Sequence, residues 1–271
     1  DWQRQVVREC RPAGNELIVE ASHEAEGQKR FKLNGDLLPK LSEWVGQFRV
    51  VFFSPESLIL VKGSPGDRRR FLDQLICQIN PLYLSQLQRY QSSLRQRNEL
   101  LKQIRNHRQS VDLLEPWDEL LVEDGVLITK ARTQVLDLLH QLAKIHHAQL
   151  TQSTEVLNLR YCPSLQKVET ADNSEEGVAG NRFRQRLQKS RSADLIYGNT
   201  SVGPHRDEFK LFIQELDSNS IQREIKLYGS QGQQRTTSLA LKLGEVELIH
   251  SQTGNMPVVL LDDVLSELDD I

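Results

Sequence analysis

The segment Pro257-Val-Val-Leu-Leu-Asp-Asp263 lies near the C-terminus. Its apolar run ends abruptly in two carboxylates, as a buried parallel strand does when it brings charge to its carboxyl end. Asp262 and Asp263 would then lie where an α/β protein can hold Mg²⁺ and an attacking water. The alternative is a buried strand that is followed by a helix cap and has no catalytic role. The stretch thus predicts a parallel sheet with a candidate metal site at its edge.

A second motif, Tyr228-Gly-Ser-Gln-Gly-Gln-Gln-Arg-Thr236, precedes a helical pattern of apolar residues: Leu239, Leu243, Val246 and Ile249. Because free N–H groups at the start of a helix attract anions, Ser230 is a candidate phosphate contact. Ser230 with Gln233 three residues later is also an ordinary capping box. The two motifs lie about thirty residues apart, in one helix-then-strand order, and this joint occurrence favours half of an ATP site.

Three further segments carry a family resemblance together with these motifs. They are Val50-Val-Phe-Phe-Ser-Pro-Glu-Ser-Leu-Ile-Leu-Val-Lys-Gly63, Asp67-Arg-Arg-Arg-Phe-Leu-Asp73 and Gly203-Pro-His-Arg-Asp-Glu208. The chain resembles the RecF family, the DNA-repair members of the ABC and SMC-like ATPases. This resemblance implies an α/β fold with an all-α insertion: an ATPase head with antiparallel and parallel sheets, carrying a helical lobe and incomplete at both ends.

The resemblance also implies a site with ATP and Mg²⁺ as cofactors. The residues that it places there are Ser230, Gly232, Gln233 and Asp269 on the nucleotide, Asp262 on Mg²⁺ and Asp263 as the catalytic residue. In related heads the signature serine acts on the nucleotide of the other subunit, so an ATP-dependent homodimer is implied. The segment Ser266-Glu-Leu-Asp269 matches the loop that crosses this dimer interface. The superfamily usually has Glu at position 263, and the shorter Asp here leads us to expect slow hydrolysis.

A phosphate-binding loop is missing from the sequence. No G-x-x-x-x-G-K-[ST] pattern occurs in the 271 residues, although such a loop is needed to cradle the phosphates of ATP. We therefore expect this to be an internal fragment, with weak ATPase activity, if any, in the complete chain.

Composition is that of an ordinary globular protein, with 38% apolar and 26% charged residues and a net charge of −3. No apolar run approaches the roughly 20 residues that span a bilayer, so no membrane partner is expected and a cytoplasmic location follows by default. The cysteines, Cys10, Cys77 and Cys162, are odd in number and widely spaced, which indicates neither a disulfide framework nor a zinc site.

Two basic clusters are candidate contacts for DNA phosphates. The residues predicted to bind DNA are Arg89, Arg95, Arg97, Lys102 and Arg105 in the first cluster and Arg182, Arg184 and Arg186 in the second. The alternative is that both are solvated helix faces. The family resemblance favours DNA, single-stranded or gapped duplex, and implies RecR and RecO as partners in recombinational repair and replication.

Patterning along the chain divides it into a first head part (1–80), an inserted helical lobe (81–193) and a second head part (194–271). Residues 1–50 alternate like strands of an antiparallel sheet, with a tight turn at Asn34-Gly35. From residue 81 the period is helical, with apolar heptads in two stretches: Leu87, Leu94, Leu101, and Leu121, Ile128, Val135, Leu142. These heptads suit either a stunted coiled-coil arm or core stripes of a helical subdomain.

Smaller features complete the prediction. Two antiparallel helices should be joined by a break at 112–118 around Pro116. An exposed loop is expected at 169–180 and a short helix at 183–188. A strand should then carry the alternating residues Phe209, Leu211 and Ile213.

Charged residues beside two turns suggest local roles. Arg68, Arg69 and Arg70 should open a helix and bind an anion, a carboxylate or a partner subunit, or else form a plain solvated face. Arg206 and Asp207 could form a salt bridge that supports the nucleotide pocket. His205 is expected to be a hydrogen-bonded structural residue and not a catalytic one.

The residues leave two competing hypotheses. One is another SMC-like head, which a long coiled coil or a membrane partner would favour. The other is a DNA-binding helical scaffold with a vestigial nucleotide half-site and no enzymatic activity.

Overall fold

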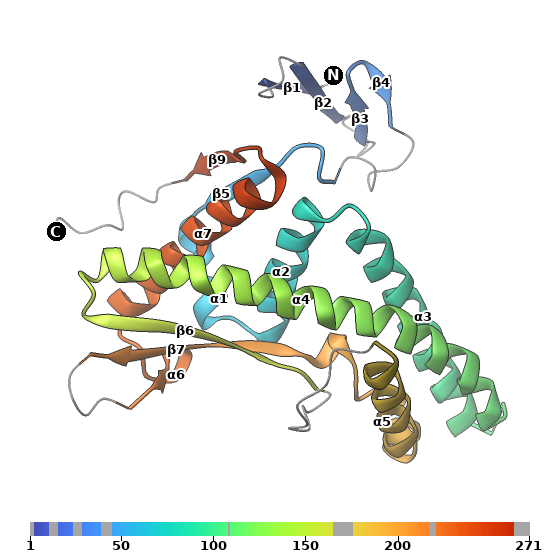
Figure 1. Cartoon of the computed structure of the whole chain (residues 1–271). Helices are drawn as coiled ribbons and strands as arrows, with labels where there is room; N and C mark the ends of the chain where they lie inside the picture. The colour runs from blue at the N-terminus through green and yellow to red at the C-terminus, as the bar shows by residue number, and fades with distance from the viewer. Residues whose placement is uncertain are drawn as a thin grey trace.

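The computed structural model describes residues 3–10, 16–23, 29–38, 45–107, 109–164, 176–216 and 221–262. Long helices form the centre of the molecule, with a small antiparallel sheet at one end and a second one along the opposite side (Figure 1). Among the described residues, no helix is both long and apolar enough to cross a membrane.

The first sheet is the antiparallel one that the sequence predicts. Its strands, in the order β1-β2-β3-β4, are Gln3–Cys10, Glu16–His23, Lys29–Leu33 and Asp36–Leu37. Asn34 (φ 51°) and Gly35 (φ 92°) join the last two strands. Two consecutive positive φ angles define the tight hairpin turn that Asn-Gly favours, so this turn is confirmed.

The apolar run before Asp262 forms β9 (Val258–Leu261), which pairs in parallel with β5 (Val50–Phe53). The parallel strand is confirmed, but its expected burial is wrong, because Leu260 is 48% and Leu261 is 65% exposed. In the described part of the chain β9 has a partner only at its β5 edge. The β5 side chains Val51 and Phe53 are buried, so this pair of strands contributes to the core mainly through β5.

Two antiparallel helices, α3 (Tyr83–Arg105) and α4 (Glu115–Leu150), follow as predicted. Their direction is evident from the pairs Arg89–Asp124 and Arg97–Asp118, in which one number rises as the other falls. The predicted break was placed too late: α4 begins after the 3₁₀ turn η3 (Val111–Leu114). Pro116 lies in the first turn of α4, where its missing N–H costs nothing.

The apolar heptads are core stripes. Leu121, Ile128 and Val135 of α4 are buried, and α4 packs along α7 (Gln231–Thr253) and on the sheet that contains β6 (Glu155–Cys162). A Cβ added to Gly244 of α7 would lie 3.1 Å from the Ala143 backbone of α4. The two helices therefore approach backbone to backbone, which is the geometry of a packed layer and not of a projecting arm.

Helix α5 (Glu176–Tyr197) corrects two predictions. Residues 176–180 are helical, where an exposed loop was expected, and the helix is much longer than 183–188; residues 169–175 of the expected loop lie outside the described residues. Phe183, Leu187 and Asp194 are completely buried. Long-range packing of these residues against α3 and α4 stabilises a helix whose first part contains two glycines, Gly177 and Gly180, which disfavour helix formation.

A second antiparallel sheet has the order β6-β7-β8, with β7 at Glu208–Glu215 and β8 at Arg223–Glu224. The alternation in β7 is confirmed, since Phe209, Leu211 and Ile213 are buried. β6 belongs by sequence to the predicted lobe, yet it pairs with a strand of the second head part. The domain boundaries stay predictions.

Short elements link these layers. They are η2 (Pro55–Leu58), α1 (Ile59–Lys62), α2 (Pro65–Ile79), η4 (Pro204–Arg206) and α6 (Ile225–Tyr228). Helix α2 opens with the predicted arginines, and Ser64 is its N-cap through a capping box with Asp67.

Candidate functional site

Ser230 is the N-cap of α7, and its hydroxyl oxygen accepts a hydrogen bond from the backbone N–H of Gln233. The backbone N–H groups of Gln231 and Gly232 lie in the first turn of α7, where no carbonyl of the helix can accept from them, and both residues are exposed. A Cβ at Gly232 would meet nothing closer than the Ser230 hydroxyl, at 3.9 Å. The start of α7 is therefore open, with donors that suit a phosphate.

Gln233 holds this helix start in place. Its side-chain oxygen accepts from the Ser230 backbone N–H at 2.8 Å, and its amide nitrogen donates to Glu155 at the start of β6 at 2.6 Å. Both polar ends of the side chain are thus engaged within the protein. Gln233 acts on Ser230 as a positioning residue, and its direct contact with a nucleotide stays a prediction.

The surface next to Ser230 is apolar. Leu227 and Tyr228 of α6 are 64% and 70% exposed. The carbonyl of Gly63 accepts hydrogen bonds from Lys226 and from Arg68, so α6 is tied to the start of α2. The sequence analysis missed this patch. The patch could have been found from the pair Leu227-Tyr228. These two large residues stand directly before Gly229 and do not belong to the apolar pattern of the following helix.

Asp262 lies at the carboxyl end of β9, as predicted. Its side chain is exposed, and its backbone N–H donates to the carbonyl of Phe53 at 2.9 Å, which extends the pairing of β9 with β5. Asp263, Ser266 and Asp269 lie outside the described residues. In the described ranges no group of three or more His, Cys, Asp or Glu side chains could hold a metal ion. A single carboxylate fits Mg²⁺ nonetheless, because this ion keeps several water ligands.

The two halves of the candidate site lie apart. Helix α7 has 23 residues and is about 34 Å long. β5 packs on α7. The helix that follows β5, α1, contacts α6, which precedes α7, so β5 runs toward the start of α7. β5 and its parallel partner β9 therefore run antiparallel to α7. β9 advances only about 13 Å in four residues. β9 lies beside the C-terminal half of α7 (Figure 1), and Asp262 directly follows β9. Ser230 lies at the other end of α7, so one chain cannot bring Ser230 and Asp262 to the same phosphate.

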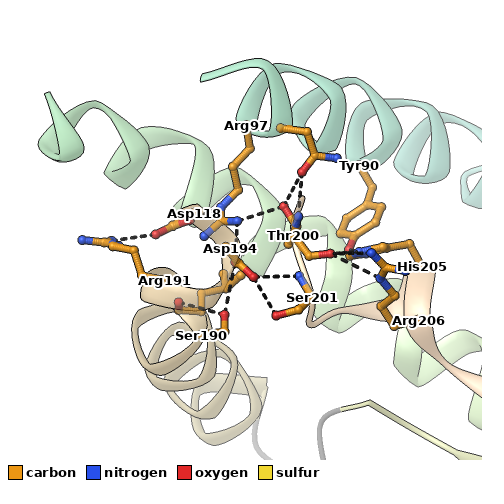
Figure 2. A network of polar contacts seen from close by, with 12 residues as sticks. Tyr90, Arg97, Asp118, Ser190, Arg191, Asp194, Thr200, Ser201, His205 and Arg206 are labelled. Carbon is orange, nitrogen blue, oxygen red and sulfur yellow. Dashed lines mark hydrogen bonds and ion pairs between the residues drawn. The ribbon is translucent and has the colours of Figure 1, made fainter. Parts of the chain in front are cut away.

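Arg97 is a correction to the predicted DNA contacts. Its side chain is completely buried and donates to Asp118 at 2.6 Å and to Asp194 at 2.9 Å, as Figure 2 shows. The same guanidinium donates to the Thr200 hydroxyl at 2.8 Å. Since a buried arginine without carboxylate partners would be very costly, this residue has a structural role and cannot reach DNA.

The other predicted DNA contacts are at least partly exposed. Arg89, Lys102 and Arg184 form ion pairs with Asp124, Glu99 and Glu119, respectively. Their side chains are 40% to 57% exposed, so pairing does not remove them from the surface. The remaining predicted contacts are Arg95, Arg105, Arg182 and Arg186, none of which is buried. Their contact with DNA stays a prediction.

The arginines at the start of α2 have partners inside the protein. Arg68 is buried and paired with Glu208, and Arg69 donates to the carbonyl of Asp207 at 2.7 Å. Arg70 is exposed. The carboxylate expected for this cluster is therefore supplied, for Arg68, by the protein's own strand β7.

The proposed Arg206–Asp207 salt bridge is wrong. Arg206 donates to the carbonyl of Thr200, while Asp207 accepts from the hydroxyl of Tyr161 at 2.6 Å and from the backbone N–H of Ser164 at 2.6 Å. Arg206 is the last residue of the 3₁₀ turn η4, whereas Asp207 already has an extended backbone, and each side chain finds a different partner.

His205 is a hydrogen-bonded residue of the interior. Its Nδ1 lies 2.7 Å from the Tyr90 hydroxyl and its Nε2 lies 3.0 Å from the carbonyl of Thr200. Burial lowers the pKa of His205 to about 4. A neutral ring that donates from Nε2 and accepts at Nδ1 satisfies both contacts.

The chain is similar to several known proteins that share one name. No family model matches it. It is 39% identical over 251 residues to the DNA replication and repair protein RecF of Acetivibrio thermocellus, and the match covers 93% of the chain and 65% of that relative. The RecF protein of an Exiguobacterium species is 42% identical over 242 residues, and the match covers 89% of the chain and 62% of that relative. The RecF protein of Bacillus cereus is 39% identical over 267 residues, and the match covers 98% of the chain and 68% of that relative.

Two solved structures are similar over the same extent. The recombination mediator protein RecF with ATP is 36% identical, with a TM-score of 0.87 over 100% of the chain and 69% of that protein. The structure of RecF with ATPrS has a TM-score of 0.86, and the match covers 99% of the chain and 68% of that protein. The chain thus spans about two thirds of the length of these relatives.

These similarities define the class first: the fold is an α/β ATPase head of the ABC and SMC-like type, with an inserted helical part. The extent of the Bacillus cereus match then settles the family. The chain belongs to the RecF family.

Proposed function

We propose that the complete protein is an ATP-dependent DNA-binding clamp of recombinational DNA repair and replication. The observation that carries this proposal is the open start of α7, where the Ser230 hydroxyl accepts from the backbone N–H of Gln233 while the N–H groups of Gln231 and Gly232 face solvent. Such a helix start is built to receive an anion.

The same geometry supports an ATP-dependent homodimer. Ser230 and Asp262 lie at different places on one chain, so a shared nucleotide needs Ser230 from one subunit and Asp262 from the other. The exposed Leu227 and Tyr228 beside Ser230 are side chains that a partner subunit would cover. Enclosure between two subunits also excludes water from the phosphates.

ATP and Mg²⁺ are the proposed cofactors. Bound Mg²⁺ neutralises charge on the phosphates during transfer. Asp262 would hold the ion, Asp263 would orient the attacking water, and Ser230, Gly232 and Asp269 would contact the nucleotide across the dimer. A weak ATPase activity is expected, because Asp263 is shorter than the glutamate usual in this superfamily.

DNA, single-stranded or gapped, is the proposed ligand of the closed dimer, and hydrolysis would release it. Similar proteins are named for DNA replication and repair, and two solved relatives for the RecFOR pathway. RecR and RecO are therefore the proposed protein partners. The exposed basic residues of α3 and α5 provide cations for phosphates.

Sedimentation velocity of the full protein with ATP, with ADP and without nucleotide tests the clamp. We expect a dimer only with ATP, and we expect Ser230→Arg to abolish it by placing a bulky side chain at the shared phosphate. Ser64→Arg is the matched control, because Ser64 is also an exposed N-cap with a capping box but lies on α2. A monomer under every condition would contradict the clamp.

The alternatives give different results in the same assays. A DNA-binding scaffold with a vestigial half-site would keep its DNA affinity without binding ATP. Another kind of SMC-like head would dimerise with ATP but would not bind single-stranded or gapped DNA.

A further inference from the structure

The last two residues of α5, Ile196 and Tyr197, have large and exposed side chains. Ile196 is 68% and Tyr197 is 74% exposed. Gly198 ends the helix with a φ of 68°, the left-handed conformation common after a helix. Large exposed side chains that adjoin one another, with charged residues beside them, are a feature of binding surfaces.

Cations of α3 lie directly against this end. Arg105 donates to the carbonyl of Ile196 at 3.2 Å. A Cβ placed on Gly198 would lie 3.1 Å from the side chain of Lys102 and 3.5 Å from that of Arg105. Lys102 is 47% exposed and its ion-pair partner, Glu99, is 63% exposed, so both remain in contact with solvent. The group of Lys102, Arg105, Ile196 and Tyr197 is called the lobe tip below.

We propose that the lobe tip binds an unpaired nucleic-acid strand, with a base stacked on the ring of Tyr197 and phosphates on Lys102 and Arg105. A flat aromatic face next to flexible cations is the combination by which proteins bind single strands without reading sequence. This inference rests on the proposed function, because it assigns a place for the DNA.

The lobe tip has rigid support. Asp194, one helical turn before Tyr197, is completely buried and accepts from Arg97 at 2.9 Å and from the Ser201 hydroxyl at 2.6 Å. These contacts fix the last turn of α5 on α3 before any ligand arrives (Figure 2). Binding to a platform that is already ordered costs less conformational entropy.

Charge favours a nucleic acid over a protein at this place. The side chains that the structure brings together at the lobe tip include two cations and one carboxylate, Glu99, which is already paired with Lys102. A polyanion gains from both cations, whereas an apolar protein surface would have to desolvate them.

The test is fluorescence anisotropy of the full protein with a labelled oligothymidylate and with a blunt duplex. We expect Tyr197→Ala to weaken binding of the oligothymidylate about tenfold, as loss of one stacked base does. Tyr197→Phe should keep the wild-type affinity. Lys102→Ala should reduce the slope of log K against log salt by about 0.7, as loss of one phosphate contact on a single strand does.

Leu82→Ala is the control, because Leu82 lies at the opposite end of α3 and is 69% exposed. It should bind like the wild type, and the melting temperature of Tyr197→Ala should be unchanged. If Tyr197→Ala keeps full affinity for the oligothymidylate, the inference fails while the clamp stands. If Tyr197→Ala loses as much affinity for the blunt duplex as for the oligothymidylate, the inference is also overturned. Absence of DNA binding by the wild type would overturn both proposals.

Discussion

Two regions of the molecule use polar side chains at helices in opposite ways. Inside the helical lobe, Arg97 is buried and paired with Asp118 and Asp194. At the start of α7, Ser230 caps its own helix while the neighbouring N–H groups of Gln231 and Gly232 stay in solvent. In the first region the protein itself supplies the ion-pair partners, and in the second region donors are left for a ligand.

This difference teaches how to separate structural from functional polar residues. A buried charge has to find its partners within the protein, because desolvation is otherwise too costly. An exposed helix start carries no such cost, so its open donors are free to serve a ligand. Changes in the first region should therefore affect stability, and changes in the second should affect binding.

The largest effect is expected from Arg97→Ala. The substitution leaves the buried carboxylate of Asp194 without its ion pair and weakens the charge balance at Asp118, which Arg191 still contacts. Loss of one partner from a buried ion pair costs about 3–5 kcal/mol. We expect a fall of this size in the free energy of unfolding, measured by urea denaturation.

Arg95→Ala is the control on the same helix, since Arg95 is exposed. Arg95→Ala should change the free energy of unfolding by no more than about 0.5 kcal/mol, as most surface substitutions do. Equal effects of the two substitutions would break the comparison, because burial would then not decide the role of an arginine in α3.

A pH-dependent effect should come next, at His205. Burial lowers the pKa of His205 from 6.5 to about 4, so between these values the unfolded chain binds a proton that the folded protein does not. The free energy of unfolding therefore falls as the pH drops from 6.5 toward 4, by about 3 kcal/mol from this group. Above pH 6.5 His205 is neutral in both the folded and the unfolded state, so it no longer makes the free energy of unfolding depend on pH.

His205→Asn isolates this contribution, because carboxylates that titrate in the same interval are common to both proteins. Denaturation at a series of pH values should show a steeper loss of stability in the wild type than in the variant. Parallel curves would mean that the ring is protonated in the fold, contrary to its contacts with Tyr90 and Thr200.

The smallest change in stability is expected at the caps. Ser230→Ala and Ser64→Ala each remove a capping box, and each should cost about 1 kcal/mol. Only Ser230→Ala should weaken the ATP-dependent dimer in sedimentation experiments. This pair of variants sharpens the comparison, since two chemically equal caps would differ in function alone. A loss of the dimer in both would assign the effect to stability.

Much of the fold could be predicted from local patterns. The Asn34-Gly35 turn, the alternation in β7, the short extended run of β9 and the Ser230 cap are all set by neighbouring residues, and the structure has each of them. Their signals lie within a few positions of one another in the sequence. Local patterns are reliable where local geometry alone decides the conformation.

The failures lie where distant residues decide. Nothing around Arg97 indicates that Asp194, 97 positions later, will bury it. Likewise, α5 is a long helix because Phe183 and Leu187 pack on other helices, which its own composition does not reveal. The exposed side chains of β9 were missed because a strand pattern shows an apolar face but not whether another element covers it.

The partners of Arg97 also set an order of folding. Asp118 is 21 positions away, whereas Asp194 and Thr200 are 97 and 103 positions away. Since a growing chain emerges from its N-terminus, α3 and α4 can pair through Asp118 long before the other two residues are made. Closing the longer loops costs more entropy and comes later. We therefore expect Asp118→Asn to slow folding and Asp194→Asn mainly to speed unfolding in stopped-flow experiments, so that one buried arginine reports both an early and a late step.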